Sequence, residues 1–354
     1  MNRNPDGRNP RPEHRTYKRP SSEPPKGSYT SNYTLFCCAA ILLLVLANFK
    51  IFSGIITGNP DTFIDAPESY GQETEREPTE NEIAVQKELE TAFEKVPVSF
   101  GDTKRGNLIL VNNDFSYDFN ASTSLVENEP LVPFVQHMTN NYVVSYPAKE
   151  TLTLEAMTAF NSLTGDFAQQ TGHRDLFILD SYRSYEDQER VYTEKGKDIA
   201  AIPGHSEHHT GLAFDLELYI GGQREDYEAV GDYAWVDNNC HKYGYVLRYP
   251  ESKTPITGFT YEPWHYRYVG KGHSYYMKTN NLCLEEYLKL LDTKPVTGER
   301  LLITTDDGET YMVYSQKITG DKCEIYVPKN YPYTLSGDNR GNIIVTCLTS
   351  DTAE

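Results

Sequence analysis

The longest apolar run of the sequence begins at Tyr33 and continues to Ile56, and it limits what the chain can become more than any other feature. Its length is enough to cross a hydrocarbon core of ~30 Å at a rise of ~1.5 Å per residue. Lys50 interrupts the run near one end, where a lysine can reach the membrane interface. We therefore expect residues 33–56 to form a single transmembrane helix, with a cleaved signal peptide as the alternative.

The charges on the two sides of this run differ in sign. Residues 1–32 form a tail rich in Arg, Lys, Pro and Asn, and the first 56 residues hold eight Lys/Arg against three Asp/Glu. Because the chain has a net charge of -18, the remainder carries about -23. The positive-inside rule predicts a single-pass protein of the cell membrane with a cytoplasmic N-terminus and an extracellular main part. The acidic remainder argues against nucleic acid as a partner.

Composition and periodicity divide the extracellular part into three segments. Residues 57–106 are acidic and rich in Pro, Glu and Thr, which predicts a spacer with a short helix around residues 83–93. The apolar run Leu108–Val111 indicates a buried strand at the start of a domain that we expect to span residues 107–292. Residues 293–354 have the texture of short strands and predict a small, separate β domain.

The domain at 107–292 mixes helical and strand patterns. Apolar residues recur every three or four positions from Leu154 to Phe167, which predicts a core helix ending near Gly172. A charged helix is expected at 185–195 and another helix around 227–243. Strands are expected at 176–179, 212–218, 245–248 and 265–269. This pattern predicts an α+β fold with a small antiparallel sheet flanked by helices.

The last segment predicts an all-β domain. Its strongest signal is Asp307-Gly308, a hairpin turn between strands at 301–304 and 310–314. Two more strands are expected at 323–327 and 343–347. If these two strands pair, Cys323 and Cys347 are candidates for a disulfide, because an exported domain meets oxidising conditions.

The segment from Ser206 to Asp215 concentrates groups that bind metals. His208 and Asp215 flank the small residues Gly211 and Ala213. An imidazole and a carboxylate of this kind can ligate one metal ion.

The segment from Glu262 to His265 supplies a third metal ligand and a candidate general base. A catalytic zinc needs about three protein ligands and an open position for water, and His265 offers another imidazole. Glu262 precedes His265 by three residues, close enough to act as a general base on metal-bound water. Trp264 lies between them and can help to exclude solvent.

Three elements of the sequence resemble the VanY-type zinc D-alanyl-D-alanine carboxypeptidase family. The family signature S-x-H-x-x-G-x-A-x-D is matched at each fixed position by residues 206–215, and the E-x-W-H element by residues 262–265. A Tyr-Arg-Ser segment with a downstream Gln is matched by residues 182–184 and Gln188. The elements occur in the family's order over roughly residues 107–270.

The resemblance implies a role for each matched residue. It implies three ligands of Zn²⁺, namely His208, Asp215 and His265. It implies Glu262 and Arg183 as catalytic residues and substrate contacts made by Arg183, Gln188 and Ser206. Trp264 beside the ligand His265 is a further candidate substrate contact. The implied partner is a peptidoglycan stem pentapeptide, from which D-alanine is removed.

Simpler interpretations of single residues stay open. Arg183 can form a structural ion pair with Asp180 or Glu186, and Asp215 can be a satisfied buried acid. Three nearby histidines, His205, His209 and His273, are expected not to be ligands, since three ligands complete a catalytic site.

Two other functions also stay open. The same zinc set serves relatives with different stem specificity, so an L,D-carboxypeptidase acting on tetrapeptide stems is one alternative. The other is a noncatalytic wall-binding sensor with the same fold, which uses the C-terminal β domain for recognition.

Overall fold

The computed structural model describes residues 78–126, 130–196 and 200–349, which belong to one compact unit. The predicted transmembrane span, residues 33–56, and the basic tail before it lie outside the described residues. Among the helices that are described, none combines the length and the apolar character needed to cross a membrane.

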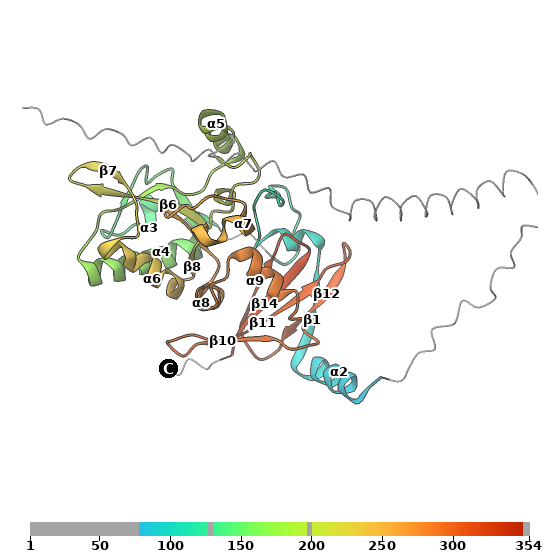
Figure 1. Cartoon of the computed structure of the whole chain (residues 1–354). Helices are drawn as coiled ribbons and strands as arrows, with labels where there is room; N and C mark the ends of the chain where they lie inside the picture. Colours follow the sequence, from blue (N-terminus) through green and yellow to red (C-terminus); the bar gives the residue numbers. More distant parts are fainter. Residues whose placement is uncertain (1–77, 127–129, 197–199, 350–354) are drawn as a thin grey trace, which may run out of the picture. The chain divides into compact units, whose positions relative to one another are not determined.

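A mixed six-stranded sheet forms the centre of the predicted metal-binding region (Figure 1). Its strand order is β3-β5-β6-β9-β8, and β7 pairs with β6 as a hairpin. Among the described pairs of this sheet, β3 and β5 run parallel and the others antiparallel. The strands are β3 Val143–Val144, β5 Leu176–Asp180, β6 Ala213–Ile220, β7 Gln223–Asp226, β8 Tyr245–Leu247 and β9 His265–Tyr268. The predicted α+β class is confirmed.

Helix α4, Leu154–Thr171, packs against this sheet as its periodicity predicts. It begins because the Thr153 hydroxyl accepts a hydrogen bond from the Ala156 N–H, and it ends at Gly172 with a left-handed φ of 80°. Phe160 is fully buried on its inner face, with its ring 4.8 Å from that of Phe214 on β6. This contact ties the helix to the strand that carries Asp215.

Shorter elements fill the surroundings of the sheet. Before β5 these are β2 Leu131–Pro133, α3 Phe134–His137 and β4 Thr151–Thr153. After β5 come α5 Tyr185–Lys195 and the 3-10 helix η3 Glu207–Thr210. The predicted helix around 227–243 is three short pieces instead, η4 Gly231–Tyr233, α6 Ala234–Asn239 and η5 Cys240–Tyr243. A further turn is built from η6 Glu251–Lys253 and α7 Thr254–Thr257.

The C-terminal part is a four-stranded antiparallel sheet in the order β10-β11-β14-β13. Its strands are β10 Leu301–Thr304, β11 Thr310–Lys317, β13 Tyr333–Gly337 and β14 Asn342–Leu348. The hairpin at Asp307-Gly308 is confirmed, with Gly308 at a φ of 91°. Helices α8 Lys271–Thr279 and α9 Leu284–Leu291 share an apolar cluster with this sheet, in which Leu288 and Ile344 are buried together.

The predicted spacer is structured in its later part, where the short helix expected around residues 83–93 is confirmed and a strand follows it. Residues Glu80–Ala92 form α2, Phe93–Val98 form β1, and Phe100–Lys104 form the 3-10 helix η2. Strand β1 pairs along its length with β12, Cys323–Pro328, as Figure 1 shows. The sequence did not reveal β1, because its partner strand lies more than two hundred residues away.

The predicted strand at Leu108–Val111 is buried but forms no strand, which corrects that expectation. Side chains satisfy its backbone groups in place of a ladder. The Ser336 hydroxyl accepts from the Leu108 N–H at 2.8 Å, and the Asn339 side chain donates to the Leu110 carbonyl at 2.8 Å. The apolar run therefore predicted the burial of this segment correctly and its conformation wrongly.

The predicted disulfide is also corrected. The strands that carry Cys323 and Cys347 do not pair, because β12 pairs with β1 whereas β14 lies between β11 and β13. In the part of the chain that the structure describes, both cysteines are free, as are Cys240 and Cys283.

Candidate active site

The two strands β6 and β9 place two of the predicted ligands side by side. Asp215 and His265 are directly opposite each other in the antiparallel register. His208 comes from η3, the short turn before β6, which Ser206 caps and Gly211 ends with a φ of 69°. The ligand atoms of these three residues lie within 4.8 Å of one another, and all three side chains are buried.

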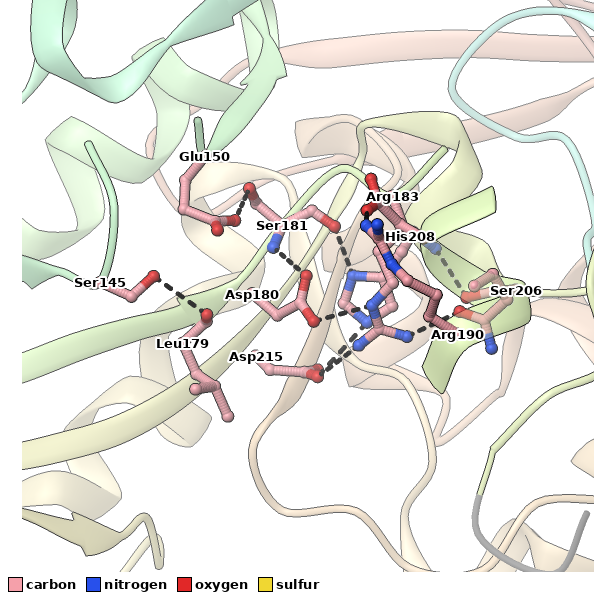
Figure 2. Close-up of polar contacts among 12 residues, drawn as sticks. Ser145, Glu150, Leu179, Asp180, Ser181, Arg183, Arg190, Ser206, His208 and Asp215 are labelled. Carbon is pink, nitrogen blue, oxygen red and sulfur yellow. Dashed lines mark hydrogen bonds and ion pairs between the residues drawn. The ribbon is translucent and has the colours of Figure 1, made fainter. Parts of the chain in front are cut away.

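Each histidine turns one ring nitrogen toward the carboxylate of Asp215. His208 Nδ1 is 2.5 Å from the carbonyl oxygen of Ser181, which leaves Nε2 3.4 Å from Asp215 Oδ2 (Figure 2). His265 Nδ1 is 2.8 Å from Asp215 Oδ1, and its Nε2 is 3.5 Å from Glu207 Oε2. Two imidazole nitrogens and a carboxylate in one buried cluster fit a divalent transition metal such as zinc.

The charges of the cluster favour a cation. Burial alone would raise the pKa of Asp215, but the two histidines hold it well below its usual range. Burial would lower the pKa of His265, yet Asp215 and Glu207 raise it to about 9. The same negative field attracts a metal ion.

Glu262 shares a cavity of about 120 Å³ with the three ligands. Burial is the main reason that its pKa rises to about 7; the nearby Asp215 raises it further, while His265 and Arg183 act in the opposite direction. A carboxyl with a pKa near neutrality can accept a proton in one step and return it in the next.

Arg183 follows β5 and points into the same cavity. Its Nε donates to Asp180 at 2.7 Å, its Nη1 to Gln188 at 2.9 Å, and its Nη2 lies 3.4 Å from Asp215, as Figure 2 shows in part. The simple ion pair with Asp180 is thus present. It holds the guanidinium in place at the cavity wall, so the structural and the functional interpretation are compatible.

The three other predicted substrate contacts have different positions. Ser206 and Trp264 line the cavity, and Trp264 is 38% exposed at its rim. Gln188 does not line it: the side chain is fully buried, its Oε1 accepts from Arg183, and its Nε2 donates to the Ala201 carbonyl at 2.7 Å. The structure therefore gives Gln188 a place behind Arg183, where it orients the guanidinium.

The histidines that were not expected to be ligands lie outside the three-residue group. His209 uses both ring nitrogens on backbone groups, those of Arg183 and Gly204. His273 is held between Tyr287 and Thr346.

The sequence analysis missed a buried set of charges behind the ligands. Glu207 is 2% exposed and bonded to Arg248 and Arg267, which are also buried. Glu207 lies between Ser206 and His208 in the signature segment, but its partners are distant in the sequence, one on β9 and one directly after β8. A sequence signal would have been the two arginines in otherwise apolar strand segments, since a buried arginine needs an acid.

Two imidazoles and a carboxylate, with a glutamate of raised pKa in the same cavity of an α+β fold, define the class of zinc-dependent hydrolases. Comparison with known proteins narrows this class. Residues 149–271 match the family described as VanY, D-alanyl-D-alanine carboxypeptidase. The chain is 33% identical over 248 residues to a D-alanyl-D-alanine carboxypeptidase of Enterococcus faecium. The aligned region covers 70% of this chain and 77% of that protein.

Two further relatives extend the comparison. The bifunctional D-Ala-D-Ala dipeptidase and D-Ala-D-Ala carboxypeptidase VanXYC of Enterococcus gallinarum is 40% identical over 129 residues, 32% of this chain and 66% of that protein. The crystal structure of the D,D-dipeptidase VanXYg with a D-Ala-D-Ala phosphinate analog superposes with a TM-score of 0.62 and 27% identity, covering 72% of this chain and 99% of that one. The chain belongs to the VanY family of D-alanyl-D-alanine carboxypeptidases, as its motifs indicated.

Proposed function

We propose that this chain is a zinc-dependent D,D-carboxypeptidase that removes the C-terminal D-alanine from peptidoglycan stem pentapeptides outside the cell. The observation that carries the proposal is the buried group of His208, Asp215 and His265 with Glu262 in the same cavity. The activity named for the Enterococcus faecium relative supports the choice of substrate.

The three ligands would hold zinc, which supplies a Lewis acid for the scissile carbonyl and lowers the pKa of water. Glu262 takes the proton from the attacking water and passes it to the nitrogen of the leaving D-alanine. Its raised pKa suits both steps, because a carboxyl of ordinary pKa would hold the proton too weakly to protonate an amine.

Arg183 supplies the positive charge that the substrate needs. Its Nη2 faces the cavity beside Asp215, while Asp180 and Gln188 fix the rest of the guanidinium. A planar fork fixed in this way can donate to the terminal carboxylate or to the oxygen that becomes negative during attack. Trp264 at the rim limits access of bulk water to these charges.

The decisive experiment incubates the purified full-length protein with synthetic pentapeptide and tetrapeptide stems and measures the D-alanine released. Matched samples contain a chelator, chelator followed by zinc, or the Glu262→Ala variant. Pentapeptide cleavage that is lost with chelator, restored by zinc and absent in the variant supports the proposal. Cleavage of the tetrapeptide alone would support the L,D-carboxypeptidase alternative. Release of the dipeptide D-Ala-D-Ala would indicate a dipeptidase, and zinc binding without turnover would indicate a noncatalytic sensor.

The proposed location is the outer face of the cell membrane, with one N-terminal helix as anchor. The apolar run at 33–56 and the basic residues before it support this. Protease treatment of intact cells should remove the part after residue 56 and leave the tail protected. A mature protein released into the medium without residues 1–56 would instead support cleavage of a signal peptide.

A further inference from the structure

The buried charges behind the metal ligands have no part in the steps above. Glu207 Oε1 accepts hydrogen bonds from Arg248 Nε and Arg267 Nη1, both at 2.8 Å. All three side chains are fully buried, at 0% side-chain exposure. Because such a group is costly to bury, replacing it with apolar residues would often stabilise a protein, and its presence calls for a reason other than stability.

The second oxygen of Glu207 gives that reason. Oε2 lies 3.5 Å from Nε2 of His265, on the far side of the imidazole from Asp215. A ligating histidine is held in one tautomer and one orientation when its other ring nitrogen donates to a carboxylate. We propose that Glu207 is a positioning residue for the metal site: it accepts the Nε2–H of His265 and thereby presents Nδ1 as the ligand atom.

The two arginines make this acceptor rigid and anionic. Both arginines donate to Oε1 of Glu207, and its Oε2 faces Nε2 of His265. The face of the imidazole is fixed separately, because Tyr249 stacks on it with ring centroids 5.0 Å apart. Orientation and protonation of His265 are thus set by different neighbours.

The positioning contact is anchored outside the motifs that carry the ligands. Arg248 makes a paired contact with Glu285 on α9, at 3.0 and 2.7 Å. Arg267 donates to the carbonyl oxygens of Asn107 and Ile109, both at 3.0 Å. The irregular segment at 107–112 and helix α9 therefore contact the two arginines, whereas Glu207 alone contacts His265.

The test compares Glu207→Gln with Glu285→Gln in the full-length protein. Both variants remove one negative charge that pairs with Arg248, but only Glu207 contacts His265. In Glu207→Gln the amide cannot offer one oxygen to the arginines and another to His265, so one contact is lost. The measured quantities are the zinc dissociation constant, by competition with a chelator, and the absorption spectrum of the cobalt(II)-loaded protein.

We expect Glu207→Gln to weaken zinc binding about 10–100-fold and to shift the cobalt bands, as for other acceptors behind a metal-bound histidine. Glu285→Gln should lower the melting temperature of the metal-free protein while its zinc affinity stays near that of the wild type. Equal zinc affinity in Glu207→Gln and wild type, or equal loss in both variants, would overturn the proposal and leave a purely structural network.

A measurement on the wild type decides the matter even if Glu207→Gln fails to fold. With ¹⁵N-labelled histidine and cadmium-113 in the site, coupling to the metal should appear at Nδ1 of His265 while Nε2 keeps its proton; coupling through Nε2 would refute the proposal. The inference rests on the metal site of the proposed function but not on turnover. Zinc affinity that depends on Glu207 without release of D-alanine would refute the function alone, and a wild type that binds neither metal would refute both.

Discussion

Replacing Asp102 with asparagine should unfold the N-terminal edge of the domain at a lower temperature. The carboxylate is fully buried, and each oxygen accepts three hydrogen bonds. Oδ2 receives the N–H and hydroxyl of Ser99 and the hydroxyl of Ser124, at 2.7–2.8 Å. Oδ1 receives three backbone N–H groups, those of Ser124, Leu125 and Val126, at 2.8–2.9 Å.

The size of the stability loss follows from the hydrogen bonds that an asparagine side chain at position 102 can still make. If the remaining oxygen keeps the three backbone N–H groups, the new NH₂ can donate to the two serine hydroxyls but meets the N–H of Ser99. The loss of charge on the surviving bonds and one unpaired buried donor together cost about 2–4 kcal/mol. At ~2–4 °C per kcal/mol for a domain of this size, the melting temperature should fall by roughly 5–15 °C.

The pH dependence gives the sign of the effect. Burial alone would raise the pKa of Asp102, but its hydrogen bonds hold that pKa well below the usual range. A depressed pKa contributes stability that is present above the unfolded pKa of about 4 and is lost as the pH falls further. The difference between wild type and Asp102→Asn should therefore be constant near neutrality and shrink below about pH 4.

Thermal unfolding of the full-length protein, followed by circular dichroism from pH 3 to 8, measures both effects. Asp118→Asn is the matched control, because Asp118 is an exposed loop residue with one side-chain hydrogen bond, to the N–H of Asn120. It should change the free energy of unfolding by less than ~0.5 kcal/mol. A melting temperature for Asp102→Asn equal to that of the control, or an unchanged difference at pH 3, would refute the reasoning.

Three other substitutions probe the site and its support. Glu262→Gln should lower kcat about 10²–10⁴-fold with unchanged zinc content by elemental analysis, because the amide keeps the shape and loses the base; a smaller loss would place the base elsewhere. Arg183→Lys should lower kcat/KM about 10–100-fold in the D-alanine assay, since one ammonium cannot replace a fork shared among Asp180, Gln188 and Asp215; near-normal turnover would mean that the fork is only structural. Phe160→Ala should destabilise the fold by about 3–5 kcal/mol in denaturant unfolding, because its fully buried ring contacts Phe214; a loss under ~1 kcal/mol would show that the core refills the cavity.

Features encoded by neighbours in the sequence were predictable. Helix α4 follows from its apolar spacing and its glycine end, and the β10–β11 hairpin from Asp307-Gly308. The ligand group was also predictable, because its residues come in two short motifs. Features that depend on distant partners were not: β1 needs β12 to be a strand, and β13 completes its sheet beside β14.

The buried charges show the same limit at the site. The role of Glu207 becomes visible only when Arg248, directly after β8, and Arg267, on β9, are seen to bond it. Gln188 is predicted as a substrate contact because it occurs in a motif, and only the packing shows that its amide also bonds Arg183 and the Ala201 carbonyl. A motif identifies which residues matter, whereas the three-dimensional contacts decide what each residue does.

The spacing of the S-x-H-x-x-G-x-A-x-D segment has a backbone explanation. The position of Gly211 favours glycine because its φ of 69° strains other residues, and a Cβ there would also force the Leu131 side chain to move. This sharp turn ends η3 and starts β6, so that His208 on the turn and Asp215 on the strand converge on one point. Since successive strand residues face opposite sides, a slip of one residue between β6 and β9 would carry Asp215 away from His265. The register of two strands and one glycine therefore fix the metal site before any ligand binds, and Glu207 in the same turn fixes the ring that faces it.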